Sequence, residues 1–200
     1  MYISLLKVYH GTISSCAENI IKNGNILKKG KPKVDFGQGF YTTNSYSFAK
    51  STAKNKAEKT NLHLGERYVV PVVLKFNVDK KLLNNLNILN FTKEDIKWAQ
   101  FIINNRNGFD YMKEVGSHFH NLKQKFDIVI GGIADNQISL LSKELKTLNK
   151  KANEIDLHNM RYSYHTKQMS FHTTKSLSCL ELVDCDIIIE NKQKGDVVNE

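Results

Sequence analysis

The stretch Asp35-Phe36-Gly37-Gln38-Gly39-Phe40-Tyr41-Thr42-Thr43 places two glycines directly before a pair of aromatic residues. Glycines at this spacing suit a tight loop that leads into a strand, because glycine adopts backbone conformations that other residues avoid. We therefore predict a short strand over residues 39–43, on which Phe40 and Tyr41 point to opposite faces. One ring can enter the core while the other lines a cleft and stacks on a planar ligand. A plain core pair at a turn explains the same residues equally well.

The elements predicted on either side of this stretch indicate an α+β fold, because strands and helices are interspersed without strict alternation. Strands are predicted over residues 2–9, 39–43, 67–78, 126–130, 168–172 and 178–189. Helices are predicted from Ser14 or Ser15 to Gly24, and over 45–59, 93–105 (capped by Thr92), 136–150 and 154–163. Pro71 is expected to mark an edge strand or a bulge.

The composition is that of a globular chain, with 200 residues of which 40% are hydrophobic and 24% charged. It excludes collagen, a long coiled coil and wholesale disorder, and no apolar run approaches the length of a membrane span. We predict one domain over residues 1–189 and a flexible tail over 190–200. The weakly apolar N-terminus and three scattered cysteines favour a cytoplasmic protein with reduced thiols. The net charge of +9 favours anionic partners, although a general abundance of lysine also explains it.

Two further short motifs carry residues suited to ligand binding. In Tyr9-His10-Gly11-Thr12, a titratable ring precedes a glycine whose exposed backbone matches the donors and acceptor of a carboxamide. In Gln168-Met169-Ser170-Phe171-His172-Thr173, the amide of Gln168 can bond a sugar hydroxyl from a strand face that it shares with Ser170. Each motif also has a purely structural explanation, as a histidine before a turn and a glutamine on a half-buried strand. His118 and His120 lack an evident third ligand, so no metal is expected.

Together the three motifs resemble the ADP-ribosyltransferase fold of the diphtheria-toxin and poly(ADP-ribose) polymerase type. That class carries a His–Tyr–Glu triad on three strands, and His10, Tyr41 and Gln168 match its positions. The Asp-Phe-Gly-x-Gly-Phe-Tyr-Thr-Thr run, the run over residues 127–136 and the Gln-x-x-Phe-His-Thr run look more closely like an uncharacterised bacterial family of that clan. Some members of that family pair with small partner proteins in toxin–antitoxin-like gene pairs.

The resemblance implies a split pair of antiparallel sheets around an NAD cleft, with flanking helices. It implies transfer of ADP-ribose from NAD to a protein or nucleic-acid acceptor, with release of nicotinamide and with an antitoxin-like protein as a further partner. The implied contacts are the Gly11 main chain on the nicotinamide carboxamide, His10 on a ribose hydroxyl, Tyr41 stacked on the nicotinamide ring and Gln168 on the 2′-hydroxyl of the nicotinamide ribose. Thr12, or the lysines within residues 28–33, would contact the pyrophosphate, and Gly39, Phe40 and Thr42 complete the expected NAD site.

Two departures from the family pattern keep other functions open. Gln168 stands where the family has glutamate, and a neutral amide offers less charge to a developing cation. Thr52 stands near the place of a second stacking tyrosine, for which Tyr46 or Phe48 would have to substitute. An NAD glycohydrolase, an enzyme that removes a 2′-phosphate from RNA, and an inactive nucleotide-binding module therefore remain alternatives.

Overall fold

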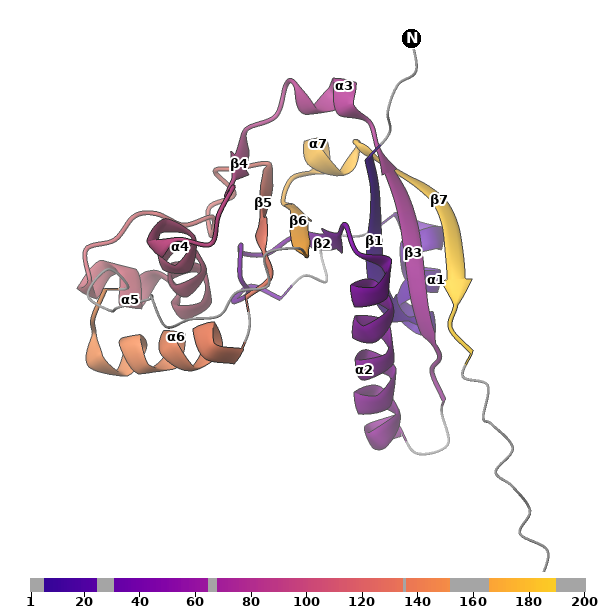
Figure 1. The fold of residues 1–200 in the computed structure, drawn as a ribbon, viewed down its shortest axis with the longest axis horizontal. Coiled ribbons are helices and arrows are strands. Elements are labelled where there is room, and N and C mark those ends of the chain that lie inside the picture. The colour runs from indigo at the N-terminus through magenta and orange to yellow at the C-terminus, as the bar shows by residue number, and fades with distance from the viewer. Residues whose placement is uncertain (1–5, 25–30, 65–67, 135, 152–165, 190–200) are drawn as a thin grey trace, which may run out of the picture.

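The computed structural model confirms the α+β class and describes residues 6–24, 31–64, 68–134, 136–151 and 166–189 (Figure 1). The strands are β1 (Leu6–Ile13), β2 (Phe40–Thr43), β3 (Pro71–Val78), β4 (Ile88–Asn90), β5 (Ile128–Gly132), β6 (Lys167–Phe171) and β7 (Leu180–Ile187). The helices are α1 (Ser14–Asn23), α2 (Tyr46–Leu64), α3 (Lys80–Leu83), α4 (Ile96–Asn107), α5 (Phe109–Glu114), α6 (Asn136–Leu148) and α7 (Thr174–Leu177). The predicted helix over 154–163, the predicted tail and residues 2–5 lie outside the described residues.

The described strands form one mixed sheet in the order β4-β5-β6-β2-β1-β3-β7, where we expected two antiparallel sheets. The sheet is mixed because β4 and β5 run parallel. It is nearly divided between β1 and β2, which share a single register pair, Tyr9 with Thr43. By contrast, β1 pairs with β3 from Leu6 to Ile13, and all of β2 pairs with β6. We call this narrow junction between β1 and β2 the seam.

Helices α1 and α2 cover opposite faces of the sheet on the β1 side of the seam. Ala17 of α1 packs with Val8 and Leu74 in one hydrophobic cluster, while Ala49 and Ala53 of α2 pack with Val73 in another. The helix predicted over residues 45–59 is thus present in α2, and its alanines are buried against the sheet. Helices α4, α5 and α6 gather at the other end of the sheet, beside β4 and β5 (Figure 1).

Gly11 is where α2 comes closest to β1. A Cβ added there would overlap the carbonyl oxygen of Ala49 and would lie 2.9 Å from its carbonyl carbon. Small residues on both elements therefore let the helix lie directly on the strand, and the absence of a side chain at Gly11 has a packing cause.

Three local predictions were wrong for identifiable reasons. Helix α1 has no side-chain N-cap bond, and α4 is capped by Asp95, whose carboxylate accepts from two backbone N–H groups, in place of Thr92. Pro71 lies between β1 and β7, away from either sheet edge, and the irregularity in the β3–β7 pairing falls at Lys75 and Phe76 and not at Pro71. It is tolerated because it is the first residue of β3, where its carbonyl still accepts from Ile188 N–H at 2.9 Å.

Candidate functional site

A pocket of about 670 Å³ opens beside the seam and is lined from both sides of it. Of the residues predicted to bind NAD, it contains Thr12 from β1, Gly39 and Tyr41 from the β2 segment, and Gln168 from β6. These positions are far apart in the sequence and are brought together by the β1–β2–β6 part of the sheet. We refer to this pocket as the seam pocket.

Tyr41 is held rigidly at the wall of the seam pocket. Its hydroxyl donates to the carbonyl of Gly37 at 2.6 Å and accepts from Phe36 N–H at 3.0 Å. Gly37 has φ +88°, a conformation that favours glycine, so the predicted tight loop is confirmed. The buried Phe36 ring lies nearly parallel to the Tyr41 ring, with centroids 6.4 Å apart. Burial, reinforced by the Asp35 charge, raises the pKa of Tyr41 far above its usual value, so the phenol stays neutral.

His10 is not among the residues that line the pocket. Its ring packs 4.5 Å from that of Phe40, and its Nδ1 donates to the carbonyl of Tyr41 at 2.6 Å. Burial, with a smaller effect of Lys56, lowers the pKa of His10 to about 3, so the ring is neutral. In this structure His10 fixes the backbone of Tyr41, whereas we expected a contact with ribose.

Phe40, Thr42 and Gly39 make packing and hydrogen-bond contacts within the sheet. Phe40 is buried in the core against Phe76, which confirms that Phe40 and Tyr41 face opposite ways. The Thr42 hydroxyl donates to the carbonyl of Met169 across the β2–β6 ladder. A Cβ on Gly39 would lie 2.7 Å from His172 Nδ1, so glycine is required there for close packing. Of these three predicted NAD contacts, only Gly39 lines the seam pocket.

Gln168 belongs to a polar network that the sequence did not indicate. Its Nε2 donates to Asp35 Oδ2 at 3.0 Å and to the carbonyl of Gly132 at 3.3 Å. Asp35 also lines the seam pocket and forms an ion pair with Arg106 of α4, whose Nη2 lies 2.6 Å from Oδ1. Asp35 stands beside the glycine motif, but nothing in the sequence links it to an arginine seventy-one positions away.

Three lysines give the seam pocket a basic side: Lys31, Lys56 and Lys59. Lys56 Nζ donates to the Gly11 carbonyl at 2.7 Å, which occupies the acceptor that we expected to meet a carboxamide. Burial lowers the pKa of Lys56. Only Lys31 falls within the predicted lysine segment; the spacing of Lys56, Lys59 and Thr60 on one face of α2 is the signal that could have indicated the others.

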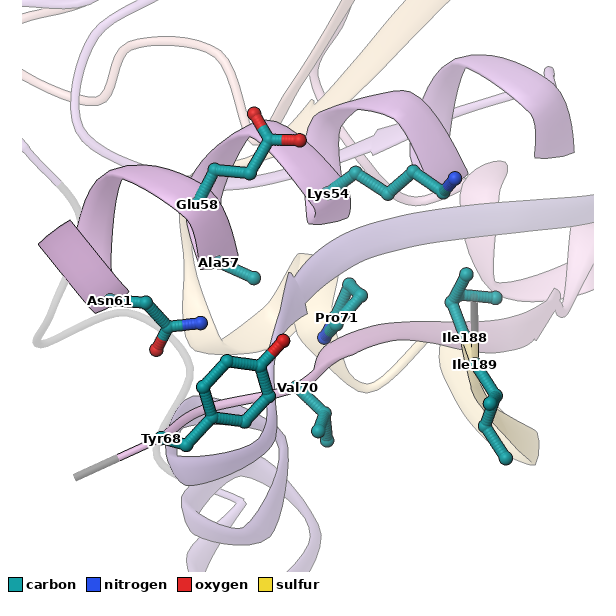
Figure 2. Close-up of a pocket in the computed structure, with 9 residues that line it drawn as sticks. All are labelled: Lys54, Ala57, Glu58, Asn61, Tyr68, Val70, Pro71, Ile188 and Ile189. Carbon is teal, nitrogen blue, oxygen red and sulfur yellow. The ribbon is translucent and has the colours of Figure 1, made fainter. Parts of the chain in front are cut away.

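The predicted substitutes for a second stacking tyrosine lie elsewhere. Tyr46 packs edge-on against Tyr9 and donates to Asp186 of β7 at 2.7 Å, and neither it nor Phe48 lines the seam pocket. Figure 2 shows a separate, smaller pocket of about 280 Å³, where residues of α2 face Tyr68, Pro71 and Ile188. None of the predicted site residues lines that pocket.

His172 is a fully buried histidine beneath the site, and it makes the fold sensitive to acid. Its Nδ1 donates to the carbonyl of Gln38, and its Nε2 lies 2.8 Å from the Ser170 hydroxyl. Burial outweighs the Gln38 bond and lowers the pKa of His172 from 6.5 to about 4. The unfolded chain therefore binds a proton that the folded protein excludes between these two pH values.

We expect the free energy of unfolding to fall by about 3 kcal/mol through His172 as the pH drops from 6.5 to 4. The contribution is complete above pH 6.5. Urea unfolding at several pH values, compared between the wild type and His172→Phe, measures it. The variant should be less stable than the wild type at pH 7.5, but its free energy of unfolding should fall less on acidification. If the free energy of unfolding falls equally with pH in the two proteins, His172 is not the group responsible. His10, present in both, adds a loss common to the two curves.

Among the described residues, no group of three or more His, Cys, Asp or Glu side chains is arranged to hold a metal ion. In the same part of the chain, no helix combines the length and apolar character needed to cross a bilayer.

Comparison with known proteins places the chain in a family. A family model described as "Protein of unknown function (DUF3990)" matches residues 6–182. The chain belongs to the DUF3990 family. The matched region contains the seam pocket from Thr12 to Gln168. None of the curated proteins and none of the solved structures matches this DUF3990 chain.

Proposed function

We propose that the seam pocket binds NAD and that the protein transfers ADP-ribose to a protein or nucleic-acid acceptor, releasing nicotinamide. The observation that carries this proposal is the convergence of Thr12, Tyr41 and Gln168 from three strands on one pocket that has lysines on its other side. A volume of about 670 Å³ is within the range of pockets that hold small molecules and cofactors. The family resemblance noted in the sequence supports the same reading.

The chemical groups in the pocket suit the parts of NAD. Tyr41 offers a flat, neutral ring for stacking on the nicotinamide. Lys31, Lys56 and Lys59 offer positive charge to the pyrophosphate of NAD. From the sequence we expected this contact from Thr12 or from the lysines within residues 28–33, of which Lys31 lines the pocket. Gln168 offers its amide oxygen to a ribose hydroxyl, because its amide nitrogen already donates to Asp35 and Gly132.

A catalytically inactive NAD- or nucleotide-binding module is the second candidate. The observation that favours it is the neutral Gln168 at the place where the resembled family carries glutamate. Such a module would bind NAD in the same pocket without releasing nicotinamide, so the two candidates differ in turnover and agree on binding.

The first test is NAD binding and cleavage by Tyr41→Ala. Loss of the stacking ring should weaken NAD binding by about 0.5–1.5 kcal/mol, or up to roughly tenfold, and should slow nicotinamide release. Calorimetry measures binding, chromatography measures nicotinamide, and labelled NAD with separated protein and nucleic-acid fractions of a cell extract identifies the acceptor class.

Tyr46→Ala is the matched control, because it removes a tyrosine that lies outside the seam pocket. Tyr46→Ala should bind NAD as the wild type does. If Tyr41→Ala and Tyr46→Ala bind equally well, NAD does not occupy the seam pocket. NAD binding by the wild type without nicotinamide release or label transfer would favour the inactive module.

A further inference from the structure

Asp35 places a carboxylate in the seam pocket beside the glutamine that stands in the glutamate position. Its Oδ1 accepts from both Nε and Nη2 of Arg106, at 2.9 and 2.6 Å. Its Oδ2 accepts from Gln168 Nε2 at 3.0 Å. A carboxylate has about four acceptor positions, two on each oxygen, so these bonds leave one position on Oδ2.

The hydrogen bonds around Asp35 and Gln168 determine which of their atoms face the pocket. Gln168 Nε2 meets two acceptors, Asp35 Oδ2 and the Gly132 carbonyl, so the amide cannot be reversed without losing both bonds. Arg106 is held by Asp35 and by Ser139 Oγ, to which its Nη1 donates at 2.8 Å, and it is not among the pocket-lining residues. The guanidinium therefore lies behind the carboxylate, and the pocket meets Asp35 together with Gln168.

We propose that Asp35 is a further catalytic residue of the NAD reaction, whose free Oδ2 position faces the nicotinamide ribose and stabilises its positive charge as nicotinamide leaves. This inference rests on the proposed function. It explains how a pocket with glutamine at the expected glutamate position still holds an anionic group, and it gives Gln168 the task of orienting that group.

The step that Asp35 assists is the cleavage of the glycosidic bond of NAD. The bond between ribose C1′ and the nicotinamide nitrogen breaks, and its electron pair returns to that nitrogen, which becomes neutral. The ribose gains oxocarbenium character, which a nearby negative charge stabilises. An oxygen or nitrogen of the acceptor, or of water, then bonds to C1′ and releases its proton. Asp35 forms no covalent bond and is regenerated unchanged.

Two variants separate a role of the charge from a role in folding. Asp35→Asn removes the charge. The double variant Asp35→Asn/Gln168→Glu moves the charge to position 168 and exchanges donor and acceptor in the hydrogen bond between the two side chains. It keeps the net charge and the shape of the pair but gives up the bond from Gln168 Nε2 to the Gly132 carbonyl. Asp186→Asn is the matched control, because Asp186 is also paired with a cation, Lys75, but lies outside the seam pocket.

Nicotinamide release, NAD affinity and melting temperature are measured for all four proteins. Asp35→Asn should slow release by about 100-fold or more while NAD affinity changes by less than about threefold. The double variant should regain at least about tenfold of that loss, because a carboxylate again faces the ribose. Asp186→Asn should release nicotinamide at the wild-type rate.

A folded Asp35→Asn protein with near wild-type release would overturn the role of Asp35 and leave the proposed function standing. If Asp35→Asn does not fold, the double variant decides. A folded double variant that releases nicotinamide supports the role of the negative charge, and a folded double variant that releases none refutes that role. A wild-type protein that neither binds NAD nor releases nicotinamide refutes the proposed function itself, and the role of Asp35 with it.

Discussion

Replacing Gly11 with alanine should destabilise the protein by about 3 kcal/mol or more. The new Cβ would overlap the Ala49 carbonyl oxygen, and a backbone atom of a packed helix cannot rotate away as a side chain can. Helix α2 would have to move off β1, and Lys56 would move with it from the Gly11 carbonyl. Urea unfolding followed by circular dichroism measures the loss of stability.

Gly132→Ala is the matched control for this substitution. A Cβ at Gly132 would also meet atoms at short range, the nearest side-chain carbon being Glu94 Cγ at 2.7 Å, but all of them belong to the Glu94 side chain, which can turn aside. We expect a loss below about 1.5 kcal/mol there. A Gly11→Ala protein as stable as Gly132→Ala would show that α2 does not lie on β1 as closely as described.

Gln168→Glu should destabilise the protein at high pH and much less at low pH. The new carboxylate would stand where Gln168 Nε2 now donates to Asp35 at 3.0 Å, so two like charges would meet in a partly buried site. The pair should keep one shared proton to a pH roughly 2 units above the usual carboxyl range, which corresponds to about 3 kcal/mol at pH 8. Placing glutamate at position 168, as in the ADP-ribosyltransferases that the sequence resembles, is therefore expected to disturb the site.

Melting temperatures of the variant and the wild type between pH 5 and 8 provide the test. The difference between the two proteins should be largest at pH 8 and shrink towards pH 5. Gln100→Glu serves as the control, because Gln100 donates to the Ser117 hydroxyl, which can donate in return. If the difference in melting temperature does not change with pH, the Gln168 side chain does not face Asp35.

The sequence predicted those parts of the site that depend on neighbouring residues. The glycine loop, the short β2 strand and the opposite directions of Phe40 and Tyr41 follow from local backbone geometry, and the structure has all of them. The buried alanines of α2 likewise follow from helical periodicity.

The sequence could not predict the features that arise only when distant segments pack together. The Asp35–Arg106 ion pair joins the glycine loop to α4, and the Lys56–Gly11 bond joins α2 to β1. His10 was expected to contact a ribose because its motif resembles that of the ADP-ribosyltransferases, but the glycine that follows it admits a helix. The single sheet was missed because one register pair is enough to join its two parts.

The seam also governs how the chain can be divided. Strands β1, β3 and β7 lie on one side of the seam, and strands β2, β4, β5 and β6 lie on the other. The backbone thus passes from one side to the other four times. No single proteolytic cut or gene truncation separates the two sides into self-contained fragments. A shortened product that ends before β6 would lack Gln168 and the strand with which β2 pairs. The seam pocket therefore forms only in a chain that includes β6.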